Sequence, residues 1–275
     1  MTNIFNYIDR KSPIHNLTGA TKFVCLLLWS FAAMVTFDTK ILALLPVVSF
    51  ILFGLSKIKL KDISFLLVFT LVFMVMNNVL VFLFSPMHGT ELYGSCTEIC
   101  KLWGNNYLTV EQLWYHLNLV LKYFSTMPIV ILFISTTEPS EFAASLNKIG
   151  VKYTIAYAVS LALRYIPDVQ REYHEISLAQ QARGIEMSSK ENIVKRLKSA
   201  SAILIPLVLQ SLERIDVITN AMELRGFGKN RKRTWYRSRK FTKADIISMI
   251  FCGALLLLSI GMNIYNGSRF WMPHF

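Results

Sequence analysis

Uncharged apolar runs alternate with short charged segments along most of this chain. The five runs with the least charge are 23–37, 41–56, 63–85, 113–137 and 244–265. A membrane-spanning helix needs about 20 mostly apolar residues, with a working range of about 17–25. The first two runs are slightly short, so we expect them to form a tight helical hairpin that turns at 38–40. The pattern predicts an all-α integral membrane protein with about five transmembrane helices.

Two further apolar runs, 153–163 and 199–212, are too short to cross a bilayer, and each continues into a polar stretch. In the second stretch, apolar residues recur at helical spacing on one face, and in the first they do so less regularly. Pro167 and Pro206 would each start or kink a helix, because proline removes a backbone donor. We therefore predict two long, half-apolar helices at the membrane face, with polar ends in the cytoplasm.

Lys and Arg are concentrated on one side of the predicted spans. The amino-terminal segment and the loop 57–62 carry three each, whereas the turn 38–40 and the loop 86–112 carry one each. The segment 138–243 carries nineteen, against ten Asp and Glu. Short cytoplasmic loops are enriched in Lys and Arg. We therefore expect a multi-pass protein of the cell membrane with its amino terminus inside.

This topology divides the chain into three expected parts. Residues 1–137 would form an amino-terminal membrane domain with about four transmembrane helices. Residues 138–243 would form a cytoplasmic domain that contains the two long helices. Residues 244–275 would supply the last transmembrane helix and an external tail.

The composition favours a membrane protein over a soluble one. Charged residues make up only 17% of the chain, compared with about 25% in soluble domains, and the net charge is +12. Eight basic residues lie within 229–243, directly before the last predicted span. Nucleic-acid binding is one interpretation of such a cluster. Attraction to anionic lipid is the better one, because clusters of 4–8 basic residues beside a span are typical of lipid binding. We expect membrane lipid as a partner, and no nucleic acid.

The sequence contains no recognisable catalytic or metal-binding motif. It has no G-x-x-x-x-G-K-[ST] phosphate loop and no H-E-x-x-H pair, and its five histidines are scattered. Cys96 and Cys100 share a polar loop and could form a disulfide bridge, but without nearby histidines their spacing is poor evidence for metal. We expect no catalytic residue, no metal site and no cofactor on this chain.

Both long helices are predicted to end in an arginine followed by glycine. The first closes on Ala182-Arg183-Gly184 and the second on Leu224-Arg225-Gly226. Counted back from each arginine, alanine stands at minus four and isoleucine at minus seven. Glycine readily ends a helix because it adopts the left-handed conformation at the residue after it. The pairing suggests two equivalent docking points. The plainer alternative is that each arginine only complements the negative end of a helix dipole.

With these two triplets inside a membrane protein, the chain resembles the transmembrane T component of energy-coupling factor (ECF) transporters, which are ABC importers of vitamins. The resemblance covers nearly the whole length and includes Thr136-Thr137-Glu138-Pro139, which is similar to the family's entry into its coupling region. It implies a subunit without catalysis of its own. Two ATP-binding cassette ATPase subunits, which carry ATP and Mg²⁺, would bind the tips of the coupling helices. A small membrane-embedded S component would capture the vitamin or other micronutrient.

The resemblance also implies which residues dock. Arg183 and Arg225 would contact the ATPases, with Ala182, Gly184 and Gly226 as flanking residues. Leu224 departs from the alanine that is more frequent there in the family, as expected if the two ATPases differ. Small residues would let the S component pack closely against the coupling helices. These are Ala156, Ala158, Ala162, Ala200 and Ala202.

Two other functions fit part of the pattern. A conventional ABC importer permease lines its own substrate path and usually offers one coupling helix per chain, so two similar tips favour the T component. A membrane-embedded enzyme acting on lipid would need a nucleophile, a base and an oxyanion donor, and no such set is recognisable.

Overall fold

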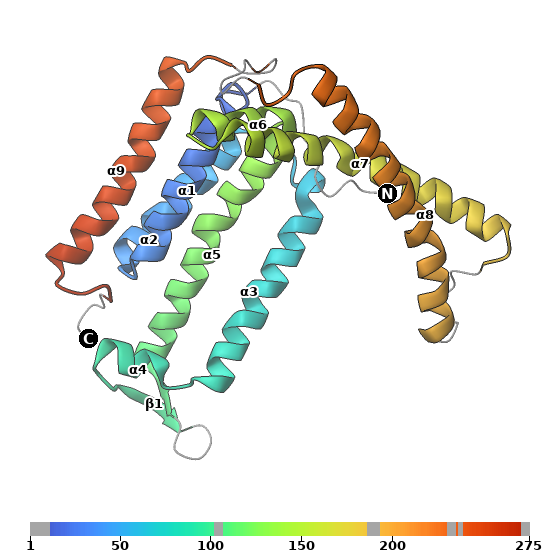
Figure 1. Cartoon of the computed structure of the whole chain (residues 1–275). Helices are drawn as coiled ribbons and strands as arrows, with labels where there is room; N and C mark the ends of the chain where they lie inside the picture. The colour runs from blue at the N-terminus through green and yellow to red at the C-terminus, as the bar shows by residue number, and fades with distance from the viewer. Residues whose placement is uncertain (1–11, 102–106, 186–192, 230–234, 236–238, 271–275) are drawn as a thin grey trace. The chain divides into compact units, whose positions relative to one another are not determined.

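The computed structural model describes residues 12–101, 107–185, 193–229, 235 and 239–270, and most of them are helical (Figure 1). Contacts between Cα atoms divide the chain into two compact units, 1–138 with 239–275, and 139–238. The first, here called the membrane unit, contains α1 (Gly19–Val35), α2 (Thr39–Leu55), the 3₁₀ turn η1 (Leu60–Ile63), α3 (Ser64–Phe84), α4 (His88–Tyr93), β1 (Glu98–Lys101), β2 (Tyr107–Thr109), α5 (Val110–Thr136) and α9 (Lys243–Tyr265). The second, here called the coupling unit, contains α6 (Pro139–Lys148), α7 (Tyr153–Ala182) and α8 (Ile193–Leu224).

Three helices of the membrane unit are long and apolar enough to cross a bilayer. They are α3, α5 and α9, and the apolar helices α1 and α2 have 17 residues each. α1 packs against α9 and α5, and α2 packs against α5. The predicted all-α membrane fold is confirmed, and every predicted span corresponds to a helix. The two short runs do form consecutive helices, separated at residues 36–38.

Polar contacts join the helices at one end of the membrane unit. Thr18, the N-cap of α1, donates to Asp245 Oδ1 from its backbone nitrogen at 2.8 Å and from its hydroxyl at 3.2 Å. Asp245 also accepts from Thr242, which caps α9. Lys22 Nζ donates to the carbonyl oxygen of Thr136, the last residue of α5, at 2.7 Å. The starts of α1 and α9 therefore meet the end of α5, as alternating spans require.

A second polar layer closes the opposite end. Asn266 Nδ2, just after α9, donates to Asp38 Oδ2 at 2.7 Å. Asn118 of α5 accepts from Thr39 Oγ1 at 2.9 Å and donates to the Tyr93 hydroxyl at 2.9 Å. Between the two layers lies an apolar core centred on Trp29, whose indole nitrogen donates to the Ser125 carbonyl oxygen at 3.1 Å. Each end of the bundle is therefore held by hydrogen bonds, and its middle by packing around Trp29 together with the Trp29–Ser125 hydrogen bond.

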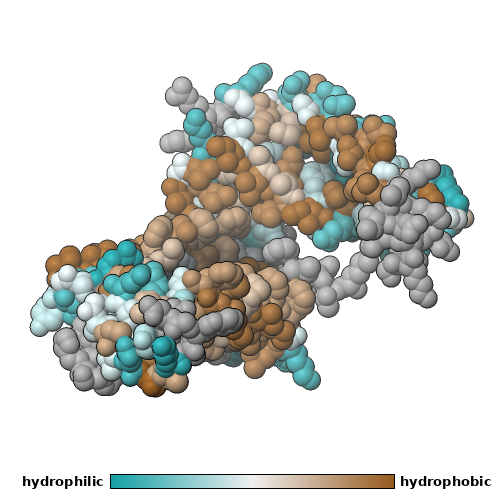
Figure 2. Space-filling model, turned by 90° about the horizontal axis from the view of Figure 1, so that it is seen from below, coloured by the Kyte–Doolittle hydropathy of each residue, from teal (hydrophilic) through white to brown (hydrophobic). Residues whose placement is uncertain are grey.

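Helix α3 has no fully buried residue, and it contacts α5 through apolar packing of Leu66 and Leu67 against the cluster that includes Met127 and through a polar contact at Asn78. Asn78 donates to Met74 O, so its Oδ1 faces His116 Nδ1 at 3.0 Å. The remaining surface of α3 is apolar, and Figure 2 shows broad hydrophobic patches on the molecular surface. Such a helix is suited to face lipid hydrocarbon or another membrane helix.

The segment between α3 and α5 contains structure that the sequence did not predict. It forms the short helix α4 and the antiparallel hairpin of β1 and β2. A Cβ at Gly89 would lie 2.7 Å from Gln112 Cα and from Glu111 O, so only glycine lets α4 approach α5 this closely. Cys96 and Cys100 are both exposed, free thiols in this structure.

Candidate functional site

The first arginine triplet forms the carboxyl end of α7. Arg183 is the C-cap, and Gly184 has a φ of +83°, in the left-handed region. The Ile185 nitrogen donates to Gln180 O at 3.1 Å, and the Gly184 nitrogen donates to Gln181 O at 2.9 Å. This pair of hydrogen bonds satisfies two of the carbonyl groups that a helix end leaves unpaired.

The second triplet ends α8 in the same way, 42 positions further along the chain. Leu224 is the last helical residue, and Gly226 has a φ of +65°. The Phe227 nitrogen donates to Met222 O at 2.9 Å, and the Gly226 nitrogen donates to Glu223 O at 2.8 Å. The arginines therefore occupy equivalent places in two equivalent helix ends, as the sequence suggested.

The side chains at both ends are largely exposed. Ala182 and Arg183 are exposed on α7, as are Leu224 and Arg225 on α8. Leu224 is 90% exposed, which is unusual for a large apolar side chain. Together with the arginine beside it, this leucine gives the α8 end a mixed apolar and cationic surface.

The helices α7 and α8 cross each other, and they run in roughly opposite directions (Figure 1). Gln180 near the end of α7 donates from Nε2 to Ala202 O on the first half of α8, at 3.1 Å. Arg214, in the second half of α8, forms an ion pair with Glu172 of α7, and its guanidinium lies 5.6 Å from the centre of the Tyr165 ring. The contacts run in opposite chain directions, so the two arginine ends lie at opposite ends of the helix pair.

An aromatic cluster fixes the α8 end against the start of α7. The Phe227 ring lies 4.8 Å from that of Tyr157 and 5.9 Å from that of Tyr153, measured between centroids. Trp235 joins both tyrosines and donates from Nε1 to Asn147 Oδ1 at 3.2 Å. From Tyr157 to Arg183 the chain rises about 40 Å, at about 1.5 Å per residue, so the two tips are separated by roughly that length.

The small residues considered for partner contact do not share one environment. Ala156 is fully buried, so it is not available to a partner. Ala158 and Ala162 are exposed and lie on one face of α7, whereas Ala200 and Ala202 are half-buried on α8. Large apolar side chains are exposed along both helices. They include Ile155, Ile166 and Tyr173 of α7, and Leu204, Val208, Leu212 and Ile215 of α8.

Neither helix end brings together a set of residues for chemistry. Within the described part of the chain, no three His, Cys, Asp or Glu residues are grouped as metal ligands. Between α7 and α8, the carboxylate of Glu172 is paired with Arg214. Of the basic run 229–243, residues 230–234 and 236–238 lie outside the described residues.

Comparison with known proteins decides between the families that such a molecule could belong to. The model of the CbiQ family, described as "Cobalt transport protein", matches residues 10–236. The chain belongs to the CbiQ family.

Named relatives place it more finely within that family, as an EcfT-type transmembrane component. The energy-coupling factor transporter transmembrane protein EcfT of Staphylococcus aureus is 30% identical over 256 residues, which cover 90% of this chain and 91% of that protein. EcfT of Streptococcus thermophilus is 25% identical over 93% of this chain and 96% of its own length. EcfT of Acidaminococcus fermentans is 36% identical over half of each chain. The resemblance stated from the sequence is confirmed.

These relatives also bear on the competing functions. They are named as transmembrane proteins of a transporter, which is consistent with a non-catalytic subunit in a complex. Both arginine triplets fall within the residues 10–236 that the family model matches. The ends of α7 and α8 therefore both lie within the part of this EcfT-type chain that the family model matches.

Proposed function

We propose that this EcfT-type chain is the coupling subunit of an ECF importer in the cytoplasmic membrane, with its amino terminus inside. Two ATP-binding cassette subunits, which bind ATP and Mg²⁺, dock on the ends of α7 and α8. A membrane-embedded S component binds the vitamin or other micronutrient. The chain converts the movement of the ATPases into movement of the S component.

The observation that carries this proposal is the equivalence of the two helix ends. Each presents an arginine at the C-cap, followed by glycine in the left-handed conformation. A guanidinium binds a carboxylate through two parallel hydrogen bonds and also stacks on aromatic rings, so it suits a groove on a protein surface. Two equivalent ends are what a pair of related ATPases would require.

The contacts between α7 and α8 supply the means of transmission. The aromatic cluster, the Glu172–Arg214 pair and the Gln180 contact tie the helices together at successive levels. A change in the distance between the two docked ATPases would therefore act on the helices as a pair. We propose that this pair tilts or rotates on each ATP cycle.

The exposed apolar faces of α7 and α8 are the proposed S-component contact. A soluble surface rarely exposes large contiguous apolar patches. Ala158 and Ala162 leave room between Ile155 and Ile166 for close approach of a partner helix. On α8 the contact would use Ala200 and Ala202 where they remain accessible. Ala156 is excluded, because its side chain is already buried.

Reconstitution in proteoliposomes tests this function. The chain would be combined with the two ATPases and an S component from the same organism, and ATP-dependent uptake of the substrate of that S component would be measured. We expect uptake with the full set and none when this chain is omitted, while the S component still binds its substrate. Equal uptake without this chain would refute the proposal.

A further inference from the structure

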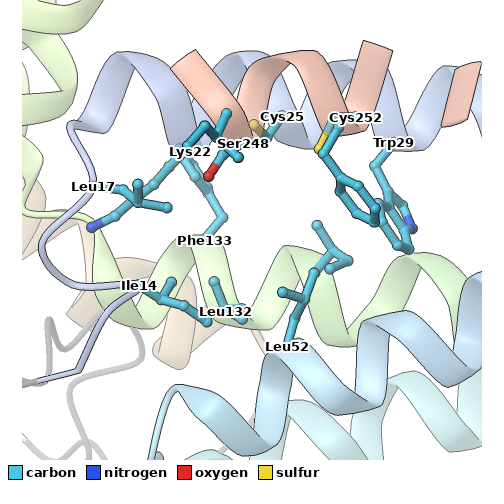
Figure 3. Close-up of a pocket in the computed structure, with 13 residues that line it drawn as sticks. Ile14, Leu17, Lys22, Cys25, Trp29, Leu52, Leu132, Phe133, Ser248 and Cys252 are labelled. Carbon is cyan, nitrogen blue, oxygen red and sulfur yellow. The ribbon is translucent and has the colours of Figure 1, made fainter. Parts of the chain in front are cut away.

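A cavity of about 250 Å³ lies within the membrane unit, between α1, α2, α5 and α9 (Figure 3). Its walls are almost wholly apolar. They include Trp29 of α1, Leu52 of α2, Leu132 and Phe133 of α5, and Phe251 and Cys252 of α9. The proposed ATPase and S-component contacts make no use of this cavity.

One end of the cavity is cationic. Lys22 lines the wall seven residues before Trp29 on α1, about 10 Å away along the helix. Its Nζ donates to Thr136 O at 2.7 Å and to His15 O at 3.5 Å. Arg239 Nη1 donates to the same His15 carbonyl oxygen, also at 3.5 Å. Two cations therefore converge on one backbone oxygen beside an apolar cavity.

Further positive charge follows directly in the chain. Lys240 and Lys243 are exposed, and Lys243 begins α9, which supplies one wall of the cavity. The carboxylate in the first turn of α9, Asp245, accepts hydrogen bonds from Thr18 and Thr242. The basic residues thus form a positively charged rim at the end of the helix bundle where α1 and α9 begin.

We propose that this cavity binds one acyl chain of an anionic phospholipid, whose phosphate lies among Arg239, Lys240 and Lys243. The cavity lies among helices that cross a bilayer, so the medium around it is hydrocarbon. Apolar cavities do not hold water stably and accept apolar groups instead. Basic residues beside a span attract anionic headgroups. An apolar acyl chain attached to a negatively charged headgroup matches both the apolar cavity and its basic rim.

The fluorescence of Trp29 gives a direct test, because this side chain is only 1% exposed and lines the cavity. The full chain would be reconstituted in vesicles of phosphatidylglycerol or of phosphatidylcholine, each brominated on its acyl chains. Bromine quenches tryptophan on contact. The Trp29 contribution is the emission that Trp29→Phe removes. We expect loss of most of this contribution in brominated phosphatidylglycerol and much weaker quenching in brominated phosphatidylcholine.

Two variants distinguish the site for the acyl chain from the site for the headgroup. Ser248→Phe places a ring in the cavity that Ser248 lines and should abolish the quenching. Lys240→Gln with Lys243→Gln changes only exposed side chains and should reduce the preference for phosphatidylglycerol by up to about 30-fold, since each basic residue near an anionic surface contributes about 1 kcal/mol. If Trp29→Phe does not fold, the phosphatidylglycerol retained on the purified chain would be counted by native mass spectrometry. We then expect one molecule on the wild type and a loss in the Lys240/Lys243 double variant.

Two results would overturn the proposal. Unquenched Trp29 in both lipids would mean that no acyl chain enters the cavity. Equal quenching by both lipids would mean that the basic rim selects no headgroup. Neither result bears on ATPase docking, so the proposal stands or falls independently of the transport function.

Discussion

Arg183 and Arg225 owe their equivalent positions to the glycine that follows each of them. At φ values of +83° and +65°, Gly184 and Gly226 turn the backbone out of the helix and direct the next amide back to a carbonyl five residues earlier. The turn leaves the arginine at the last, exposed position of the helix. The glycine thus fixes where the arginine points, and the arginine supplies the charge.

This relation predicts different outcomes for two substitutions of Gly184. A Cβ at Gly184 would meet no atom within 4 Å, so the cost of Gly184→Ala comes from backbone conformation alone, about 1–2 kcal/mol. Asparagine tolerates the left-handed region better, so Gly184→Asn should cost less. We expect weaker ATPase binding for the alanine variant and near-normal binding for the asparagine variant, measured by titration of the purified proteins. Equal effects of both variants would contradict this account.

At the scale of elements, the ion pair between α7 and α8 couples the two helices. The side chains of Arg214 and Glu172 are 29% and 13% exposed, and Glu172 Oε2 is buried without a hydrogen-bond partner. Removing the arginine alone would leave a mostly buried carboxylate without its charge partner. The ion pair therefore contributes more to the relative alignment of α7 and α8 than to the free energy of unfolding.

A double-mutant cycle tests the role of this ion pair. We expect Arg214→Met alone to lower the thermal unfolding temperature more than Arg214→Met combined with Glu172→Met, with an interaction energy of about 1–2 kcal/mol. Glu175→Gln changes an exposed carboxylate on the same helix and serves as the control, with an expected effect within about 0.5 kcal/mol. Additive effects of the two substitutions would show that the pair does not join the helices.

The elements that the sequence predicted well are those set by local pattern. The apolar runs located the helices α1, α2, α3, α5 and α9, and the Arg-Gly triplets located the ends of α7 and α8. The sequence predicts helix starts less well, because a charged residue such as Lys22 can lie inside a helix. α1 begins at Gly19 and includes Lys22, whose ammonium is satisfied by Thr136 O, 114 residues away. No local pattern could predict such a partner.

Long-range contacts account for the other features that the sequence did not predict. The hairpin of β1 and β2 and the close approach at Gly89 depend on how the segment after α3 folds back onto α5. The crossing of α7 with α8 and the burial of Ala156 depend on contacts with other elements rather than on sequence spacing. The cavity lined by Trp29 needs four helices to form. The contact between Asn78 of α3 and His116 of α5 likewise joins residues 38 positions apart.

At the scale of the whole molecule, the proposed topology places the thiols of the chain in different compartments. Cys96 and Cys100 are exposed in the loop between α3 and α5, which would face outside, whereas Cys252 is buried in the membrane unit and Cys25 is partly so. We expect a membrane-impermeant maleimide to label intact cells that express the wild type and to leave the Cys96→Ser, Cys100→Ser variant unlabelled. In that double variant, Gln181→Cys at the α7 end should react only after the membrane is permeabilised. Labelling of Gln181→Cys in intact cells would reverse the proposed orientation.

Recovery of the ATPases with this chain tests most directly whether Arg183 and Arg225 dock them. The chain would be purified with the two ATP-binding cassette proteins, as wild type, Arg183→Glu, Arg225→Glu and the control Arg171→Glu, an exposed arginine on the side of α7. Lysine variants at 183 and 225 keep the helix-end charge but lose the planar fork. We expect the wild type and Arg171→Glu to recover both ATPases. Arg183→Glu and Arg225→Glu should each lose one or both ATPases, and the lysine variants should bind them more weakly than the wild type does. Equal recovery in every variant would mean that the paired arginines are only helix-end charges and would contradict the docking role.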